Sequence, residues 1–80
     1  MALDKDNILQ QLAEIIAEET GIRPEDITPT KSFADDLDID SLSIMTIFTL
    51  AEDAFGVEIP DDAVKDLATV QDAVDLIANA

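Results

Sequence analysis

Apolar residues recur at helical spacing in three separate stretches, and this periodicity constrains the fold more than any other feature of the sequence. The stretches cover about residues 4–20, residues 40–55 and the residues after Thr69. A further short helix is expected at 61–66. Since a helix that is apolar on one face must bury that face, the sequence predicts an all-α fold, a four-helix bundle with three main helices, one short helix and a long first crossover loop.

The predicted crossover loop, residues 21–40, carries Pro24 and Pro29, which prevent a long helix. A connection of this length is uncommon in a compact domain, and such loops tend to be functional. It leads directly into Asp40 and Ser41. Four apolar residues are expected to anchor it on the core, namely Ile22, Ile27, Phe33 and Leu37.

Residues with strong positional preferences mark the expected helix ends. Either Asp4 or Asp6 is expected to cap the first helix, and Gly21 is expected to end it in the left-handed conformation. Asp61 is expected to cap the short helix. The spacing Thr69–Asp72 resembles a capping box at the start of the last helix.

The composition limits the chemistry available to this chain. Eighty residues correspond to one domain, which is expected to span residues 1–80. The sequence contains no cysteine, histidine, tyrosine or tryptophan, so it lacks the usual thiol nucleophile, general base and metal ligand. We therefore expect a protein that is not an enzyme, with no catalytic residues and no metal site.

Charge is the second compositional constraint. Nineteen acidic residues against four basic ones give a formal net charge of −15. Nucleic acid and anionic membrane both require a basic surface, so neither is an expected partner. The acidic residues either attract a basic protein surface or serve only to keep the protein soluble. The chain is expected to be a monomer.

Two further observations concern localisation. Acidic residues stand in the first seven positions, where a signal peptide needs a basic segment followed by an apolar one. The longest apolar stretch, residues 42–51, is interrupted by hydroxyl residues and is too short to span a bilayer. The sequence therefore predicts a cytoplasmic protein.

The acidic run from Ser32 to Leu42 first suggests an EF-hand calcium loop. If Asp36 is placed at the first loop position, Ser41 occupies the position of the required glycine. Ile47 then occupies the position of the bidentate glutamate. Both decisive positions fail, so a divalent-metal sensor is a weak alternative.

Ser41 is better explained by its expected place at the start of the second main helix. Unpaired backbone N–H groups and the helix dipole favour a phosphate at such a position. No neighbouring group would activate the hydroxyl, which points to a side chain that another enzyme modifies. An ordinary helix-capping serine remains the alternative. Leu42 and Met45 are expected to be exposed on the same face, either as a docking patch or as isolated surface residues.

Asp40-Ser41-Leu42, which opens a helix after an acidic loop, resembles the attachment motif of acyl carrier proteins. Further stretches resemble landmarks of that family in the same order, namely residues 15–22, 32–37, 55–60 and 69–74. Residues 35–43 are similar to carriers of actinobacterial dissociated fatty-acid and mycolic-acid systems. The resemblance covers nearly the whole chain.

The resemblance implies that a phosphopantetheinyl transferase attaches 4′-phosphopantetheine from coenzyme A to Ser41, with Asp40 and Leu42 completing the motif. The thiol of that arm would carry acyl groups as thioesters for fatty-acid synthase enzymes with basic docking patches. The residues that match the family's acyl pocket, each equally explained as core, are Phe33, Ile47, Phe48, Ala51, Phe55, Ile59, Val64 and Leu67. The acids that match family docking positions are Asp36, Asp40, Glu52, Asp53 and Glu58, beside the apolar pair Leu42 and Met45.

Alternatives remain open from the sequence alone. A polyketide-synthase carrier shares the same motif, whereas a peptidyl carrier usually shows a more glycine-rich context around the serine. Ser43 and Thr46 stand where relatives often carry acids, so partner preferences need not transfer from those relatives. From a different class, an acidic interaction module would leave Ser41 unmodified or phosphorylated by a kinase.

Overall fold

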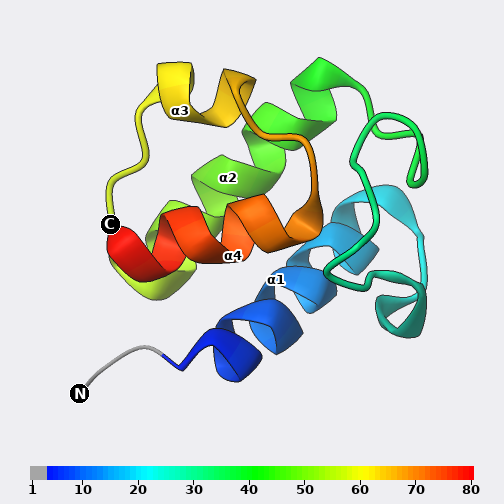
Figure 1. Ribbon diagram of the computed structural model, residues 1–80, viewed down its shortest axis with the longest axis horizontal. Helices are drawn as coiled ribbons and strands as arrows, with labels where there is room; N and C mark the ends of the chain where they lie inside the picture. The colour runs from blue at the N-terminus through cyan, green and yellow to red at the C-terminus, as the bar shows by residue number, and fades with distance from the viewer. Residues whose placement is uncertain (1–3) are drawn as a thin grey trace.

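Each of the three apolar stripes forms a helix in the computed structural model, which describes residues 4–80 (Figure 1). The elements in chain order are α1 (Lys5–Thr20), the short 3₁₀ helix η1 (Pro24–Asp26), α2 (Ser41–Phe55), α3 (Asp61–Lys65) and α4 (Val70–Asn79). The predicted all-α bundle with three main helices and one short helix is confirmed. Extended pairing within residues 4–80 is limited to an isolated bridge between Ser32 and Thr69.

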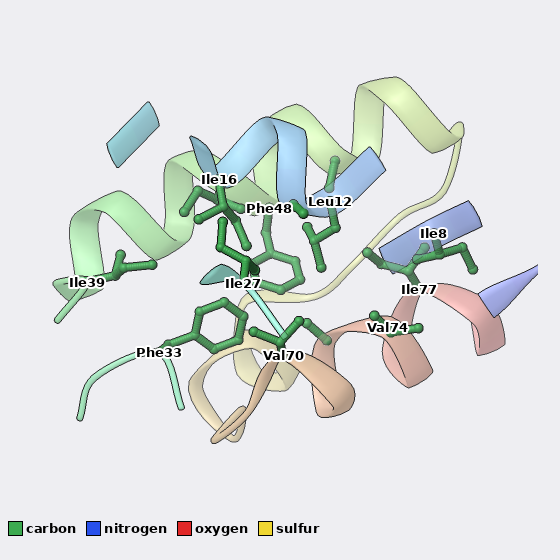
Figure 2. Close-up of a cluster of buried hydrophobic side chains, with 14 of the residues drawn as sticks. Ile8, Leu12, Ile16, Ile27, Phe33, Ile39, Phe48, Val70, Val74 and Ile77 are labelled. Atoms are coloured by element: carbon green, nitrogen blue, oxygen red, sulfur yellow. The ribbon is translucent and has the colours of Figure 1, made fainter. Parts of the chain in front are cut away.

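The core lies where α1 packs against both α2 and α4, while α3 packs on α2. Figure 2 shows its side chains gathered between the main helices, with Phe33 from the crossover loop meeting Phe48 of α2. The two rings form an edge-to-face pair with centroids 6.3 Å apart and planes at 69°. The core residues supplied by the three main helices are Ile8, Leu12, Ala13, Ile16, Ile47, Phe48, Ala51, Val70, Ala73, Val74 and Ile77.

The crossover loop is anchored as predicted by Ile27, Phe33 and Leu37, which are buried, while Ile22 is half-buried. Ile39 is an additional buried anchor that the sequence analysis missed. Its backbone N–H donates to the Phe33 carbonyl at 2.8 Å, which folds the end of the loop back on itself.

The same loop is also tied to the connection between α3 and α4. The Phe33 N–H donates to the Ala68 carbonyl at 3.1 Å, and the Val70 N–H donates to the Lys31 carbonyl at 2.9 Å. These backbone hydrogen bonds join segments more than thirty residues apart. They fix the connection between α3 and α4 relative to the loop that precedes α2.

Most of the predicted helix ends are confirmed. The Asp4 carboxylate, rather than that of Asp6, caps α1 by accepting from the Asp6 N–H at 3.1 Å, and Gly21 follows with φ of +81°. Thr69 and Asp72 form the predicted capping box of α4. The prediction for Asp61 was wrong, because the extended backbone of Pro60 makes that residue the N-cap and Asp61 the first helical residue.

None of the helices in residues 4–80 combines the length and the apolar character that are needed to cross a bilayer. The expectation that no signal peptide is present rests partly on residues 1–3, which lie outside the described residues.

Candidate functional site

Ser41 is the first residue of α2, and its side chain is exposed. The preceding Asp40 is the N-cap, and its Oδ1 accepts from the Ser43 N–H at 2.8 Å. No described residue forms a hydrogen bond with the Ser41 hydroxyl. The local sequence explains this arrangement, because an aspartate at the cap satisfies an N–H that the helix leaves unpaired. The Ser41 hydroxyl is therefore held in a defined place and remains free to react.

The capping hydrogen bond also changes the acidity of Asp40. The Ser43 N–H, and secondly the Ser43 hydroxyl, lower the pKa of Asp40 below its ordinary value of 3.8, and slight desolvation acts in the opposite direction. A carboxylate with a lowered pKa is a weaker base. Asp40 is thus suited to capping the helix and poorly suited to removing the proton of the Ser41 hydroxyl.

This lowered pKa predicts how the cap responds to acid. Since the folded-state pKa lies below the unfolded one, the cap stabilises the fold at neutral pH, and this stabilisation is lost as the pH falls through the folded-state value. Asp40→Asn should keep the cap but lose this dependence. We expect urea unfolding below pH 3.8 to show a shallower decline of stability for Asp40→Asn than for the native chain. Parallel declines would contradict the assigned role of the Asp40 charge.

A cavity of about 350 Å³ opens beside Ser41. Its walls come from the crossover loop, the first turns of α2, and α3 with the residues that follow it. The lining residues are Ala34, Ser41, Ile44, Met45, Val64, Lys65 and Leu67. We call this the Ser41 cavity. It is mainly apolar, with one hydroxyl and one ammonium group, so it can receive a flexible chain that starts at the Ser41 oxygen.

The eight residues predicted for an acyl pocket all belong to, or pack against, the same hydrophobic core. Those that are buried are Phe33, Ile47, Phe48, Ala51, Ile59 and Val64. Phe55 and Leu67 are half-buried. Of the eight, Val64 and Leu67 line the Ser41 cavity. Ala34 and Lys65 also line the cavity and were not predicted from the sequence, because nothing in the local pattern indicates that these segments meet at Ser41.

The predicted docking acids divide into two groups. Asp36 accepts from the Ser32 N–H, Asp40 from the Ser43 N–H and Glu52 from the Ile59 N–H, each at 2.8 Å, so these three carboxylates are occupied by internal hydrogen bonds. Asp53 and Glu58 are exposed, and no described residue hydrogen-bonds to their side chains. Acids of the second group can change charge without loss of an internal hydrogen bond.

The two predicted docking apolar residues also differ. Leu42 is 80% exposed, as expected. The prediction that Met45 is exposed was wrong, because this residue is half-buried and faces the Ser41 cavity between α2 and α3. Leu50, at 44%, is the other large exposed hydrophobic side chain of the described chain. No cluster of three or more potential metal ligands occurs among residues 4–80.

Comparison with known proteins places this site in a family. The family profile described as "Phosphopantetheine attachment site" matches residues 10–77. An acyl carrier protein from Acidothermus cellulolyticus is 61% identical over 80 residues, which cover 100% of this chain and 95% of that protein. One from Myxococcus xanthus is 62% identical over 76 residues, which cover 95% and 96% of the two chains.

Comparison of the fold with solved structures also indicates an acyl carrier protein. A solved structure of the acyl carrier protein from Enterococcus faecalis is 35% identical, with a TM-score of 0.78 over 96% of this chain and 98% of that one. The matched residues begin within α1 and end within α4, and they include Ser41 at the start of α2. The chain therefore belongs to the acyl carrier protein family, whose members carry acyl groups on a covalently attached 4′-phosphopantetheine arm.

Proposed function

We propose that this chain carries acyl groups as thioesters on a 4′-phosphopantetheine arm attached to Ser41, serves the enzymes of fatty-acid biosynthesis, and catalyses no reaction itself. The observation that carries the proposal is the position of Ser41, the first residue of α2, on the wall of an apolar cavity. Its side chain is exposed, and its hydroxyl makes no hydrogen bond within residues 4–80. The arm supplies the thiol that the sequence lacks, since the chain has no cysteine.

Attachment requires little from the chain itself. The Ser41 Oγ forms a bond to the phosphorus of the pantetheine phosphate of coenzyme A, the hydroxyl proton leaves, and 3′,5′-ADP is the leaving group. Asp40 fixes the first turn of α2 and so fixes the position of this oxygen. Because Asp40 Oδ1 accepts the Ser43 N–H and the pKa of Asp40 is lowered, we propose that the transferase supplies the base.

Incubation with coenzyme A and a promiscuous phosphopantetheinyl transferase tests the proposal. We expect intact-mass spectrometry to show an increase of one phosphopantetheine per chain, with conversion of the whole sample. A chain that keeps its original mass, under conditions that modify another acyl carrier protein completely, would contradict the proposed function.

The acyl chain is proposed to enter the bundle through the Ser41 cavity. Val64 and Leu67 lie on its wall, and the apolar core continues behind them. Each methylene moved from water into such an interior contributes on the order of 0.8 kcal/mol, which offsets the parting of the helices only for longer chains. Ala51 has no exposed surface, so a larger residue there would strain the core itself, whereas half-buried Leu67 can be changed with less disruption.

Partners are proposed to recognise the negative surface that surrounds Ser41. The net charge of −15 would attract enzymes with basic patches and accelerate their encounter with the carrier. Exposed Leu42, next to the modified serine, would provide an apolar contact at the centre of this surface. We propose that the carrier works in the cytoplasm. Service to a polyketide synthase, in place of the fatty-acid enzymes, remains the alternative.

A further inference from the structure

Lys65 is the one basic side chain that lines the Ser41 cavity within residues 4–80. The full sequence has only four basic residues. Lys5 forms an ion pair with Asp75 at 2.9 Å between α1 and α4, and Arg23 pairs with two acids of η1. No carboxylate of the described residues forms an ion pair with Lys65. Its ammonium group is therefore available to a ligand in the cavity.

The surroundings of Ser41 are otherwise unfavourable for another negative charge. Asp38 and Asp40 are exposed within the three residues before it. Asp61 and Asp62 are exposed on α3, the helix that faces Ser41 across the cavity. A phosphodiester on Ser41 adds a negative charge to a chain that already carries −15.

The helix end compensates for that charge only in part. Unpaired N–H groups at the start of a helix are good donors to a phosphate. In α2 the Ser43 N–H is already taken by the Asp40 carboxylate, at 2.8 Å. Fewer backbone donors therefore remain for the phosphodiester, and a nearby cation would stabilise its charge where these donors do not.

We propose that the Lys65 ammonium pairs with the phosphodiester on Ser41 and holds the arm over the Ser41 cavity. This proposal rests on the proposed attachment at Ser41. Lysine binds phosphate as a point charge with three donors, and its flexible four-carbon stem lets the ammonium follow the phosphate. Since Lys65 belongs to α3 and Ser41 to α2, the pair links the two helices that border the cavity. Lys65 is then a positioning residue for the arm.

Thermal unfolding of the unmodified and the phosphopantetheine-bearing forms tests the pairing. For each protein, the measured quantity is the Tm with the arm minus the Tm without it. At low salt we expect this difference to be lower in Lys65→Met than in the native chain by about 1–5 °C, as for an exposed ion pair in a small domain. The difference should largely disappear near 1 M salt, where the Debye length is only about 3 Å. Comparing the two forms of each variant cancels the effect that Lys65 has on α3 without the arm.

Two further variants separate a specific pair from a general charge effect. Lys65→Arg keeps the charge and should retain most of the native response. Lys31→Met removes an exposed lysine that lies outside the Ser41 cavity, and it should behave like the native chain. In NMR spectra of the modified protein, the Lys65 methylene protons should show cross-relaxation with the pantetheine protons nearest the phosphate.

Intact mass, measured first, distinguishes the possible failures. If the native chain gains no phosphopantetheine, the proposed function and this inference are both wrong. If every variant gains one, but Lys65→Met responds to the arm as the native chain does, only the role of Lys65 is wrong. An equal response of Lys31→Met and Lys65→Met would also overturn it, because net charge alone would then explain the effect.

Discussion

Replacing Ser41 by alanine is expected to abolish the addition of phosphopantetheine completely, while Ser43→Ala and Ser32→Ala are expected to leave it intact. Ser41 is exposed, and its hydroxyl forms no hydrogen bond with any residue of 4–80. Ser43 is half-buried, and its N–H donates to Asp40. The Ser32 Oγ accepts from the N–H groups of Asp35 and Asp36 at 3.2 and 3.0 Å, so it is occupied within its own turn.

Intact mass after exhaustive incubation with coenzyme A and transferase provides the measurement, and peptide fragmentation of the native chain locates the modified residue. Ser41 is exposed and its side chain makes no hydrogen bond to a described residue. The free energy of unfolding of Ser41→Ala should therefore lie within about 0.5 kcal/mol of the native value. That similarity is the control for folding. Modification that persists in Ser41→Ala and maps to Ser43 or Ser32 would refute the assignment of the site.

Phe48→Ala is expected to cause the largest loss of stability among single changes on α2, about 3–5 kcal/mol, as is usual for truncation of a buried aromatic ring. Phe48 is 2% exposed and packs edge-to-face on Phe33 of the crossover loop. Removing the ring leaves a cavity and also removes one of the contacts that hold this loop on the bundle. Since native domains have only about 5–15 kcal/mol of stability in total, this loss would remove a large share of the stability of the fold.

Leu42→Ala is the matched control on the same helix, because that side chain is 80% exposed and its removal should change stability by less than about 0.5 kcal/mol. Urea unfolding of both variants measures the contrast. The exposed position of Leu42 gives a second expectation, namely slower modification of Leu42→Ala by the transferase at limiting enzyme. Similar losses of stability in the two variants would mean that Phe48 does not hold the core together as described.

Features that depend on neighbouring residues could be predicted from the sequence. The apolar stripes predicted α1, α2 and α4, because helical periodicity depends only on residues three or four positions apart. Gly21 and the capping box of α4 were predictable for the same reason, since caps form within one turn. The position of Ser41 at the start of α2 follows from the same local rules, whereas its modification stays a prediction from the family resemblance.

Other features were decided only by the tertiary structure, because they depend on segments far apart in the chain. The helical pattern predicts that Glu52 is a surface acid. Its carboxylate nevertheless accepts from the Ile59 N–H, because the chain turns back after α2 toward α3. Met45 is half-buried because α3 packs against α2, and a helical pattern in α2 alone cannot indicate how much of its face that short helix covers. Lys65 reaches the cavity of Ser41 for the same reason. Lys65 and Ser41 are far apart along the chain, and they are brought together by the packing of α3 on α2 and by the hydrogen bonds that hold the α3–α4 connection on the crossover loop. Neither is visible in the local sequence.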